Sequence, residues 1–175
     1  MLDIRSLEFA YPDSDFTLAI EHLEIAAGEK LAVIGPSGSG KTTLLNLVSG
    51  IIQPKHGEIR VADTRIERLS DAARRDFRIN QIGFVFQDFE LIDYLNVFDN
   101  IVHPYRISRA LQLTDDVRQR ARELADRADI GDKLRRHPGE LSQGEKQRVA
   151  ICRALLQRPK LVFADEATGN LDPRN

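Results

Sequence analysis

Apolar side chains follow two different spacings along the sequence, and the first is found near its start. In the first thirty residues apolar and polar positions alternate in short segments, which is the spacing of a strand with one buried face. A turn-forming segment, Tyr11-Pro12-Asp13-Ser14, separates two of them. The alternating apolar residues are Leu7, Phe9, Leu18, Ile20, Leu23 and Ile25. This pattern predicts a small antiparallel sheet.

Three short, continuous apolar runs predict strands that are buried on both faces, unlike the alternating strands near the start of the chain. They cover residues 30–34, 82–86 and 160–164. The first run ends in a glycine-rich segment, and helical spacing follows over residues 41–49. The other two lead directly into polar residues, Gln87 and the pair Asp165 and Glu166. Functional groups at strand ends are typical of α/β folds, so we predict an α/β core with a mainly parallel sheet.

Between the second and third runs the spacing becomes that of a helix. Thr114 has the side chain of an N-cap, and the apolar residues after it recur every 3.6 positions until about Gly131. These residues are Val117, Ala121, Leu124, Ala125 and Ala128. We predict a helical subdomain at about 88–140. It is inserted into a single domain whose core is formed by about 1–87 and 141–175.

The composition is that of an ordinary globular domain. Of the 175 residues, 42% are hydrophobic and 30% are charged, which is enough for one sizeable core. Lysine and arginine number 25 against 27 for aspartate and glutamate, giving a formal net charge of -2. A dedicated nucleic-acid-binding protein needs a basic surface, so we expect no nucleic acid among the partners.

Several features of the sequence indicate the cellular compartment in which the protein is expected. The single cysteine, Cys152, leaves no disulfide framework and is predicted to be a buried structural thiol in a reducing environment. The first ten residues are charged at Asp3, Arg5 and Glu8 and lack the apolar core of a secretory signal. No run approaches the roughly 20 apolar residues of a spanning helix. We therefore expect a cytosolic protein that reaches a membrane only through a partner.

The glycine-rich segment carries the first chemical motif. Its residues are Gly35, Pro36, Ser37, Gly38, Ser39, Gly40, Lys41 and Thr42, with Thr43 following. Glycines let backbone N–H groups turn inward around phosphate oxygens, a lysine adds charge for the β- and γ-phosphates, and the Thr42 hydroxyl can bind Mg²⁺. The motif predicts a site for ATP and Mg²⁺, and the alternative is a plain glycine-rich turn.

The acidic pair after the third run supplies the second motif. Asp165 is placed to hold the water shell of the metal, and Glu166 to act as general base toward the attacking water. The alternative is a solvated acidic pair without a catalytic role. Kinases, GTPases and motor ATPases all remain possible at this point, because a phosphate loop is common to them.

A third motif discriminates among these classes. Residues 141–148 read Leu-Ser-Gln-Gly-Glu-Lys-Gln-Arg, which resembles the signature motif of ABC ATPases. The phosphate loop, Gln87, the acidic pair and the segment from Gly169 to Asp172 occur in the order and spacing of that family. The chain is therefore identified, over essentially its whole length, as resembling an ABC transporter ATP-binding domain.

The resemblance implies roles for particular residues. Cassettes of the family pair head to tail, so a homodimer forms on ATP binding and the signature of one copy completes the site of the other. By position, Tyr11 corresponds to the aromatic residue that stacks on adenine, and Gln87 to a catalytic switch residue that contacts Mg²⁺. Ser142 and Gly144 correspond to contacts of the γ-phosphate in trans. Asn170 and Asp172 fall in the loop between subunits.

Two of these positions have a second interpretation. Tyr11 lies near Phe9 and Phe16, so its ring could simply pack on the small sheet. The signature departs from the common Leu-Ser-Gly-Gly-Gln form, and Ser142 with Glu145 fits a capping box at the start of a helix. Because a carboxylate near a γ-phosphate would repel it, we assign Glu145 to capping and not to catalysis.

The resemblance also implies a membrane partner. Residues 166–172 and the signature glutamate are most similar to cassettes of lipoprotein release and macrolide export. Such cassettes meet a transmembrane permease subunit through the segment 87–96, on the cytoplasmic face of the plasma membrane. The apolar residues Phe89, Leu91, Ile92 and Leu95 are predicted to form the docking surface, with ordinary packing as the alternative.

Other functions within the family fit less well. Chromosome-maintenance proteins carry a long coiled coil before the signature, and translation-associated proteins usually join two cassettes. A stronger alternative is a hydrolysis-deficient ATP-binding module. In related cassettes a switch histidine follows the inter-subunit loop, whereas this sequence ends at Asn175. The pattern therefore predicts a cassette truncated before that histidine, which binds ATP but hydrolyses it poorly.

Overall fold

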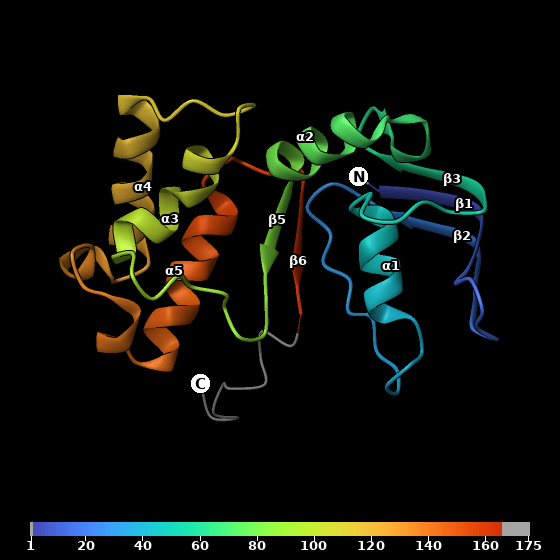
Figure 1. Ribbon diagram of the computed structural model, residues 1–175, viewed down its shortest axis with the longest axis horizontal. Coiled ribbons are helices and arrows are strands. Elements are labelled where there is room, and N and C mark those ends of the chain that lie inside the picture. Colours follow the sequence, from blue (N-terminus) through green and yellow to red (C-terminus); the bar gives the residue numbers. More distant parts are fainter. Residues whose placement is uncertain (1, 166–175) are drawn as a thin grey trace. The chain divides into compact units, whose positions relative to one another are not determined.

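The computed structural model describes residues 2–165, and the chain divides into two compact units, Met1–Arg78 and Ile79–Asn175 (Figure 1). Helix α2 (Asp71–Gln81) carries the chain from the first unit into the second. The predicted division into a core and a helical subdomain at about 88–140 stays a prediction.

The first unit is built on a four-stranded antiparallel sheet. Its strands are β1 (Leu2–Ala10), β2 (Thr17–Ile25), β3 (His56–Val61) and β4 (Thr64–Arg65), in the order β2-β1-β3-β4. Strands β1 and β2 pair from Leu2 opposite Ile25 to Ala10 opposite Thr17. The alternating pattern therefore predicted the β1–β2 hairpin correctly, whereas β3 and β4 were not predicted.

Helix α1 (Lys41–Val48) lies against β3 and closes the core of this unit. Leu47 and Val48 of the helix are buried, as are Ile4 and Ile59 of the sheet. A short 3₁₀ helix, η1 (Ile66–Arg68), follows β4. The helix predicted at 41–49 is confirmed.

The prediction of a strand at residues 30–34 is wrong. The run has no regular structure, and Leu31, Val33 and Ile34 are exposed. A strand exists through hydrogen bonds to a neighbouring strand, and within the described part of the chain this run has no such ladder. Apolar composition alone could not reveal the missing neighbour.

The second unit contains the parallel part of the fold. Strands β5 (Ile82–Val85) and β6 (Leu161–Ala164) pair in parallel, with Val85 opposite Ala164. Both coincide with predicted runs. A parallel pair needs a long crossover, and here residues 86–160 provide it.

Three α-helices of the crossover gather beside the β5–β6 pair (Figure 1). They are α3 (Val97–Ile107), α4 (Asp115–Arg127) and α5 (Gln143–Leu155), with short 3₁₀ helices η2 (Gly131–Lys133) and η3 (Pro138–Glu140) between α4 and α5. Thr114 caps α4 as predicted, accepting a hydrogen bond from the backbone N–H of Val117. Val97, Ile101, Ala121, Val149 and Cys152 are among the residues of their shared core.

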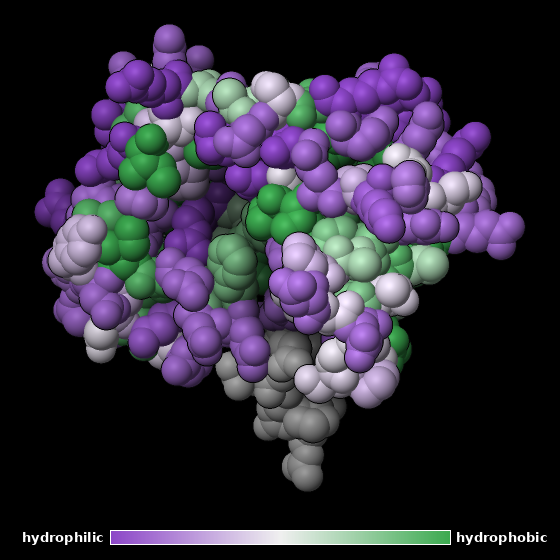
Figure 2. Space-filling model, turned by 45° about the vertical axis from the view of Figure 1, so that its right-hand side comes forward, coloured by the Kyte–Doolittle hydropathy of each residue, from purple (hydrophilic) through white to green (hydrophobic). Residues whose placement is uncertain are grey.

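The face shown in Figure 2 is mostly hydrophilic, with hydrophobic patches between the charged side chains. Tyr94 and Ile107 of the second unit are among the large apolar side chains that are exposed. Within residues 2–165 no helix has the length and apolar character needed to cross a membrane.

Candidate nucleotide site and signature segment

The glycine-rich loop leads directly into α1. Gly40 is the N-cap residue and adopts a left-handed conformation with φ 94°, and Gly38 has φ 79°. No side chain in the described part of the chain caps this helix. The first turn reads Lys-Thr-Thr, so neither a capping side chain nor a carboxylate competes for its N–H groups. Free amides at a helix N-terminus, with the positive end of the helix dipole, form a binding site for phosphate.

Lys41 places its positive charge on this loop. Its ammonium group donates hydrogen bonds to the carbonyl oxygens of Gly35 at 2.7 Å and Pro36 at 2.9 Å. An ammonium group has three donors, so two bonds hold it against the loop and a third donor remains for an oxygen of the phosphate chain. The lysine is therefore positioned by the same loop whose amides would bind the phosphates.

The structure brings Tyr11 to the start of α1. Its hydroxyl shares a hydrogen bond of 3.3 Å with the hydroxyl of Thr43, which is buried. The Tyr11 ring meets Phe9 edge-on, with 4.7 Å between centroids, and is tilted toward Phe16 at 6.0 Å. Tyr11 as a residue is 39% exposed, so the ring packs on the sheet while part of the side chain stays open to a planar ligand.

Phe16 was not predicted to belong to this site. A Cβ added to Gly40 would lie 2.9 Å from the tip of the Phe16 ring, so this ring occupies the space beside the last glycine of the loop. Glycine is therefore required at position 40 for two reasons: the backbone has a positive φ, and a Cβ would collide with the Phe16 ring. The sequence holds only a weak signal for this contact, because 24 positions separate the two residues.

In the second unit, Gln87 and Asp165 follow the paired ends of β5 and β6. The backbone N–H of Asp165 donates to the carbonyl oxygen of Val85 at 3.0 Å, which extends the parallel ladder by one residue. Both side chains belong to exposed residues. Because the two strands are parallel, both residues follow the same edge of the β5–β6 pair. Glu166, Asn170 and Asp172 lie outside the described residues.

The signature segment begins α5 with a reciprocal cap. The Ser142 hydroxyl accepts a hydrogen bond from the Glu145 backbone N–H at 3.3 Å, and the Glu145 carboxylate accepts one from the Ser142 N–H at 2.7 Å. Lys133 lies 3.3 Å from the same carboxylate. The bonds from Ser142, followed by the contact with Lys133, lower the pKa of Glu145. The assignment of Glu145 to capping is confirmed.

Gly144 occupies an open position on this helix. Its φ is not positive, and a Cβ added to it would meet no atom of the described residues within 4 Å. Neither backbone conformation nor packing inside the chain therefore requires glycine here. A glycine that its own chain does not need is expected where another molecule approaches the helix closely.

The apolar residues after Gln87 are less exposed than the predicted docking surface requires. Phe89 is buried against α5, and Leu91 is partly buried against the helical core. The prediction that Phe89 is part of an exposed docking surface is therefore wrong, because its ring completes a core that the linear pattern could not show. Tyr94 is 81% exposed, although it was not among the residues predicted to form the docking surface.

Asn100 explains how this loop keeps its shape. Its fully buried side chain accepts a hydrogen bond from the N–H of Ile92 and donates to three carbonyl oxygens, those of Ile92, Leu95 and Asn96, over 2.8–3.1 Å. A polar residue on the apolar face of α3 is the sequence signal that could have found it. The loop is thus supported from inside the unit, while Tyr94 is left on the surface.

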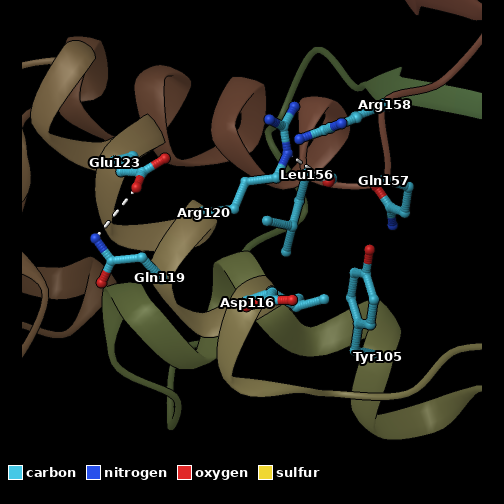
Figure 3. Close-up of a pocket in the computed structure, with 9 residues that line it drawn as sticks. Tyr105, Asp116, Gln119, Arg120, Glu123, Leu156, Gln157 and Arg158 are labelled. Atoms are coloured by element: carbon cyan, nitrogen blue, oxygen red, sulfur yellow. Dashed lines mark hydrogen bonds between the residues drawn. The ribbon is translucent and has the colours of Figure 1, made fainter.

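A groove of about 380 Å³ lies where α3, α4 and the end of α5 meet (Figure 3). Arg120 reaches from α4 and donates to two carbonyl oxygens at the C-terminal end of α5, that of Leu155 at 3.2 Å and that of the C-cap residue Leu156 at 3.0 Å. Tyr105 of α3 and Asp116 of α4 line the same groove. Arg120 therefore serves to hold α4 against the C-terminal end of α5.

Each of the two units carries oxygen groups of the kind that bind magnesium. Among residues 2–165 no three His, Cys, Asp or Glu side chains cluster as a metal cage. Mg²⁺ usually takes one or two protein oxygens, several waters and substrate phosphates. The hydroxyl of Thr42, the amide oxygen of Gln87 and the carboxylate of Asp165 are oxygen ligands of the kind that magnesium prefers.

Fold and motifs together define a phosphate-loop ATP-binding cassette, and comparisons with known proteins agree. The family model for ABC transporters matches residues 19–169. The chain therefore belongs to the ABC transporter family, as an ATP-binding domain.

Two relatives within this family are ATP-binding proteins of lipoprotein-releasing systems. The lipoprotein-releasing system ATP-binding protein LolD of Pseudomonas fluorescens is 41% identical over 98% of this chain and 76% of its own length. The LolD protein of Chromohalobacter salexigens is 45% identical over 86% of this chain and 62% of its own. The chain is thus an ABC transporter ATP-binding domain similar to LolD.

Solved structures support the same fold. The dimeric ATP-binding cassette MJ0796, in a post-hydrolysis state with ADP and Pi, has a TM-score of 0.80 and 32% identity, covering 99% of this chain and 77% of that one. The protein cbiO1 of Clostridium perfringens, part of the ABC transporter complex cbiONQ, has a TM-score of 0.87 and 31% identity, covering 99% and 68%. The predicted fold class is confirmed.

Proposed function

We propose that this chain binds ATP with Mg²⁺, hydrolyses it, and couples nucleotide-driven dimerisation to a transmembrane subunit on the cytoplasmic face of a membrane. The transport reaction that we propose is export or lipoprotein release, as the names of the LolD relatives indicate for those proteins. One observation carries the proposal. The N-terminus of α1 offers uncapped amides beside the loop-bound ammonium of Lys41, which is an arrangement suited to a triphosphate.

The proposed division of roles among residues follows from the resemblance to the family and from the chemistry of the side chains. The loop amides and Lys41 bind the phosphates, and the Tyr11 ring receives the adenine. Thr42, Gln87 and Asp165 would hold Mg²⁺, which when bound neutralises charge on the phosphate oxygens. Glu166 is proposed as the base that orients and deprotonates the attacking water.

The signature segment is proposed to act on the nucleotide of a second copy. Ser142 and Gly144 are exposed at the N-terminus of α5, and Gly144 leaves room that its own chain does not fill. The MJ0796 cassette, which this chain resembles, has been solved as a dimer. We therefore propose a homodimer in which each α5 N-terminus meets the γ-phosphate bound by the partner.

Steady-state turnover and calorimetry with Mg-ATP test the enzymatic part. Glu166→Gln should keep ATP and Mg²⁺ affinity while turnover falls roughly a hundredfold or more, because the base is lost at constant volume. Asp165→Asn should instead weaken the dependence on Mg²⁺. An unmodified chain that binds ATP without turnover would identify a hydrolysis-deficient module, and a chain that binds no ATP would contradict the proposal altogether.

The contact with the membrane subunit is proposed at the loop 87–96. Tyr94 is exposed on a loop that the Asn100 side chain holds from inside, which is a rigid support for a docking residue. Co-purification with a co-expressed transmembrane permease subunit tests the contact. Tyr94→Ala should reduce recovery of the complex, and Ile107→Ala, another exposed apolar residue of the second unit, is the control. Equal recovery of both variants would place the contact elsewhere.

A further inference from the structure

The groove between α3, α4 and the end of α5 has no part in the proposed function. All the residues that line it belong to the second unit. Its volume of about 380 Å³ lies within the range of about 300–1,000 Å³ that is usual for ligand-binding pockets. The groove is therefore a candidate binding site that the second unit forms by itself.

Two arginine side chains meet in this groove. Arg120 donates to the carbonyl oxygens of Leu155 and Leu156, which leaves part of its set of five N–H donors unused. Figure 3 shows the side chain of Arg158 extending toward the guanidinium group of Arg120. Arg158 lies in the turn after α5, with φ 55°, and its backbone N–H donates to Leu155 at 3.1 Å. The backbone thus holds the turn, and the Arg158 side chain is not needed for it.

The charges of these two arginines are not compensated inside the chain. Among residues 2–165, neither guanidinium group forms an ion pair with a carboxylate, and the Arg158 side chain has no hydrogen-bond partner. Neighbouring like charges repel each other, and an anion placed beside both would be attracted to each. A guanidinium group is also well suited to carboxylate and phosphate, because its N–H groups match a pair of oxygen atoms.

Tyr105 adds a third kind of donor to the groove. The residue is half-buried, and within the described part of the chain its hydroxyl has no hydrogen-bond partner. Burial raises the pKa of Tyr105, and the charges of Arg120 and Arg158 oppose that effect, so the phenol lies within electrostatic reach of both. A phenol hydroxyl in such a place usually has a partner. Here that partner has to come from another molecule.

Two carboxylates line the groove as well. The Glu123 carboxylate accepts a hydrogen bond from the Gln119 side chain at 3.2 Å. Asp116 lies one turn before Arg120 on α4, yet the two form no ion pair, since Arg120 is bonded to α5 instead. A bound anion is therefore attracted at the arginines and repelled by Asp116. The groove favours a ligand whose negative charge is confined to one position.

We propose that this groove binds an acidic segment of a partner polypeptide, whose carboxylate is held by Arg120, Arg158 and the Tyr105 hydroxyl. The groove is much larger than a single carboxylate group, and Val117 and Leu156 add apolar residues that can contact a methylene stem. Arginine and tyrosine are also enriched among the residues that dominate binding at protein interfaces. Charge complementarity thus identifies the occupant, and the proposal does not depend on nucleotide binding.

Titration of the full chain, labelled with ¹⁵N, tests the proposal by NMR at low ionic strength, where screening is weak. The probe is a hexaglutamate peptide with blocked termini, and hexaglutamine is its uncharged counterpart. Hexaglutamate should shift the signals of Tyr105, Arg120 and Arg158 to saturation, and hexaglutamine should not. Signals of residues 35–43 are followed separately, because the phosphate loop also attracts anions.

Arg158→Gln should weaken the binding of hexaglutamate about tenfold, because a charge-assisted contact is lost. Arg127→Gln is the matched control. Arg127 is exposed in the last turn of α4 and does not line the groove, so this variant loses the same charge elsewhere. It should bind within about twofold of the unmodified chain. Arg158→Lys, which keeps the charge without the planar fork, should bind more tightly than Arg158→Gln.

Two further variants change the groove in opposite directions. Tyr105→Phe removes only the hydroxyl and should weaken binding several-fold. Asp116→Asn removes the repelling charge and should strengthen binding several-fold. A gain in affinity cannot result from partial unfolding, so Asp116→Asn keeps the proposal testable even if another variant is destabilised.

Three results would overturn the proposal. Hexaglutamate could leave the groove signals unchanged, or Arg158→Gln and Arg127→Gln could bind it equally, which would indicate diffuse attraction to the surface. Citrate, a free small anion, is the third comparison. If citrate shifts the same signals at equal or lower concentration than hexaglutamate, the groove is a site for small anions and not for a polypeptide segment.

Discussion

Ser142 and Glu145 exchange two hydrogen bonds at the start of α5, at 2.7 and 3.3 Å, and Lys133 pairs with the same glutamate. The carboxylate is therefore used within its own helix terminus, with a cation beside it. This arrangement accounts for a glutamate in a segment that is proposed to approach a phosphate. The negative charge is neutralised by the backbone N–H of Ser142 and the ammonium group of Lys133 instead of facing the ligand alone.

Lys41→Ala should weaken ATP binding roughly a hundredfold, because hydrogen bonds to charged phosphate oxygens are lost while the loop amides remain. Calorimetry with Mg-ATP measures the change. Lys55→Ala is the control, since Lys55 is an exposed lysine of the same unit outside the loop. Unchanged affinity in Lys41→Ala would refute the assignment of the phosphate loop.

Substitutions of Tyr11 distinguish adenine stacking from packing. Tyr11→Ala should weaken ATP binding by roughly tenfold, since stacking on a base contributes about 1–3 kcal/mol, while affinity for inorganic tripolyphosphate stays the same. Tyr11→Phe keeps the ring and loses only the hydrogen bond to Thr43, so its effect should be several-fold smaller. If Tyr11→Ala lowers the melting temperature but affects both ligands equally, the ring has a packing role only.

Two substitutions in the signature segment test completion of the site in trans. Ser142→Arg should leave ATP binding by the monomer intact and block the ATP-dependent dimer, because a bulky side chain would obstruct the γ-phosphate of the partner.

Gly144→Ala sharpens this test, because the added methyl group has open space around it in the chain itself. It should raise the free energy of unfolding by about 0.5 kcal/mol, as alanine favours a helix, yet reduce dimer formation. Light scattering that shows undiminished dimers in both variants would count against the trans contact.

Cys152 should be nearly unreactive in the folded protein. Burial raises the pKa of its thiol to about 11. At pH 8 its thiolate fraction is then roughly a hundredfold below that of an ordinary cysteine, so alkylation should be slower by about that factor. The rate should rise tenfold per pH unit up to that pKa, and unfolding in guanidinium should restore ordinary reactivity. Fast labelling of the folded chain would show that the thiol is accessible.

The sequence by itself determined those features whose interacting residues lie close together along the chain. The phosphate loop, the start of α1, the Thr114 cap and the Ser142–Glu145 box each depend on residues within a few positions of one another. Their hydrogen bonds follow from local backbone geometry and from side chains already visible in the sequence. The common edge occupied by Gln87 and Asp165 was predictable as well, because parallel strands align their carboxyl ends.

Tertiary structure alone decided the contacts between residues far apart in the chain. The linear pattern gave no sign that Phe16 would pack beside Gly40, that Phe89 would be buried, or that residues 30–34 would lack a neighbouring strand. Arg153 on α5 donates hydrogen bonds to the carbonyl oxygens of Phe89 and Glu90, which lie 64 and 63 residues earlier in the chain. An arginine on a helix normally faces solvent, so its position in the sequence did not indicate this contact. Which of many distant partners a side chain meets depends on how whole elements pack, and spacing along the chain carries no information about that choice.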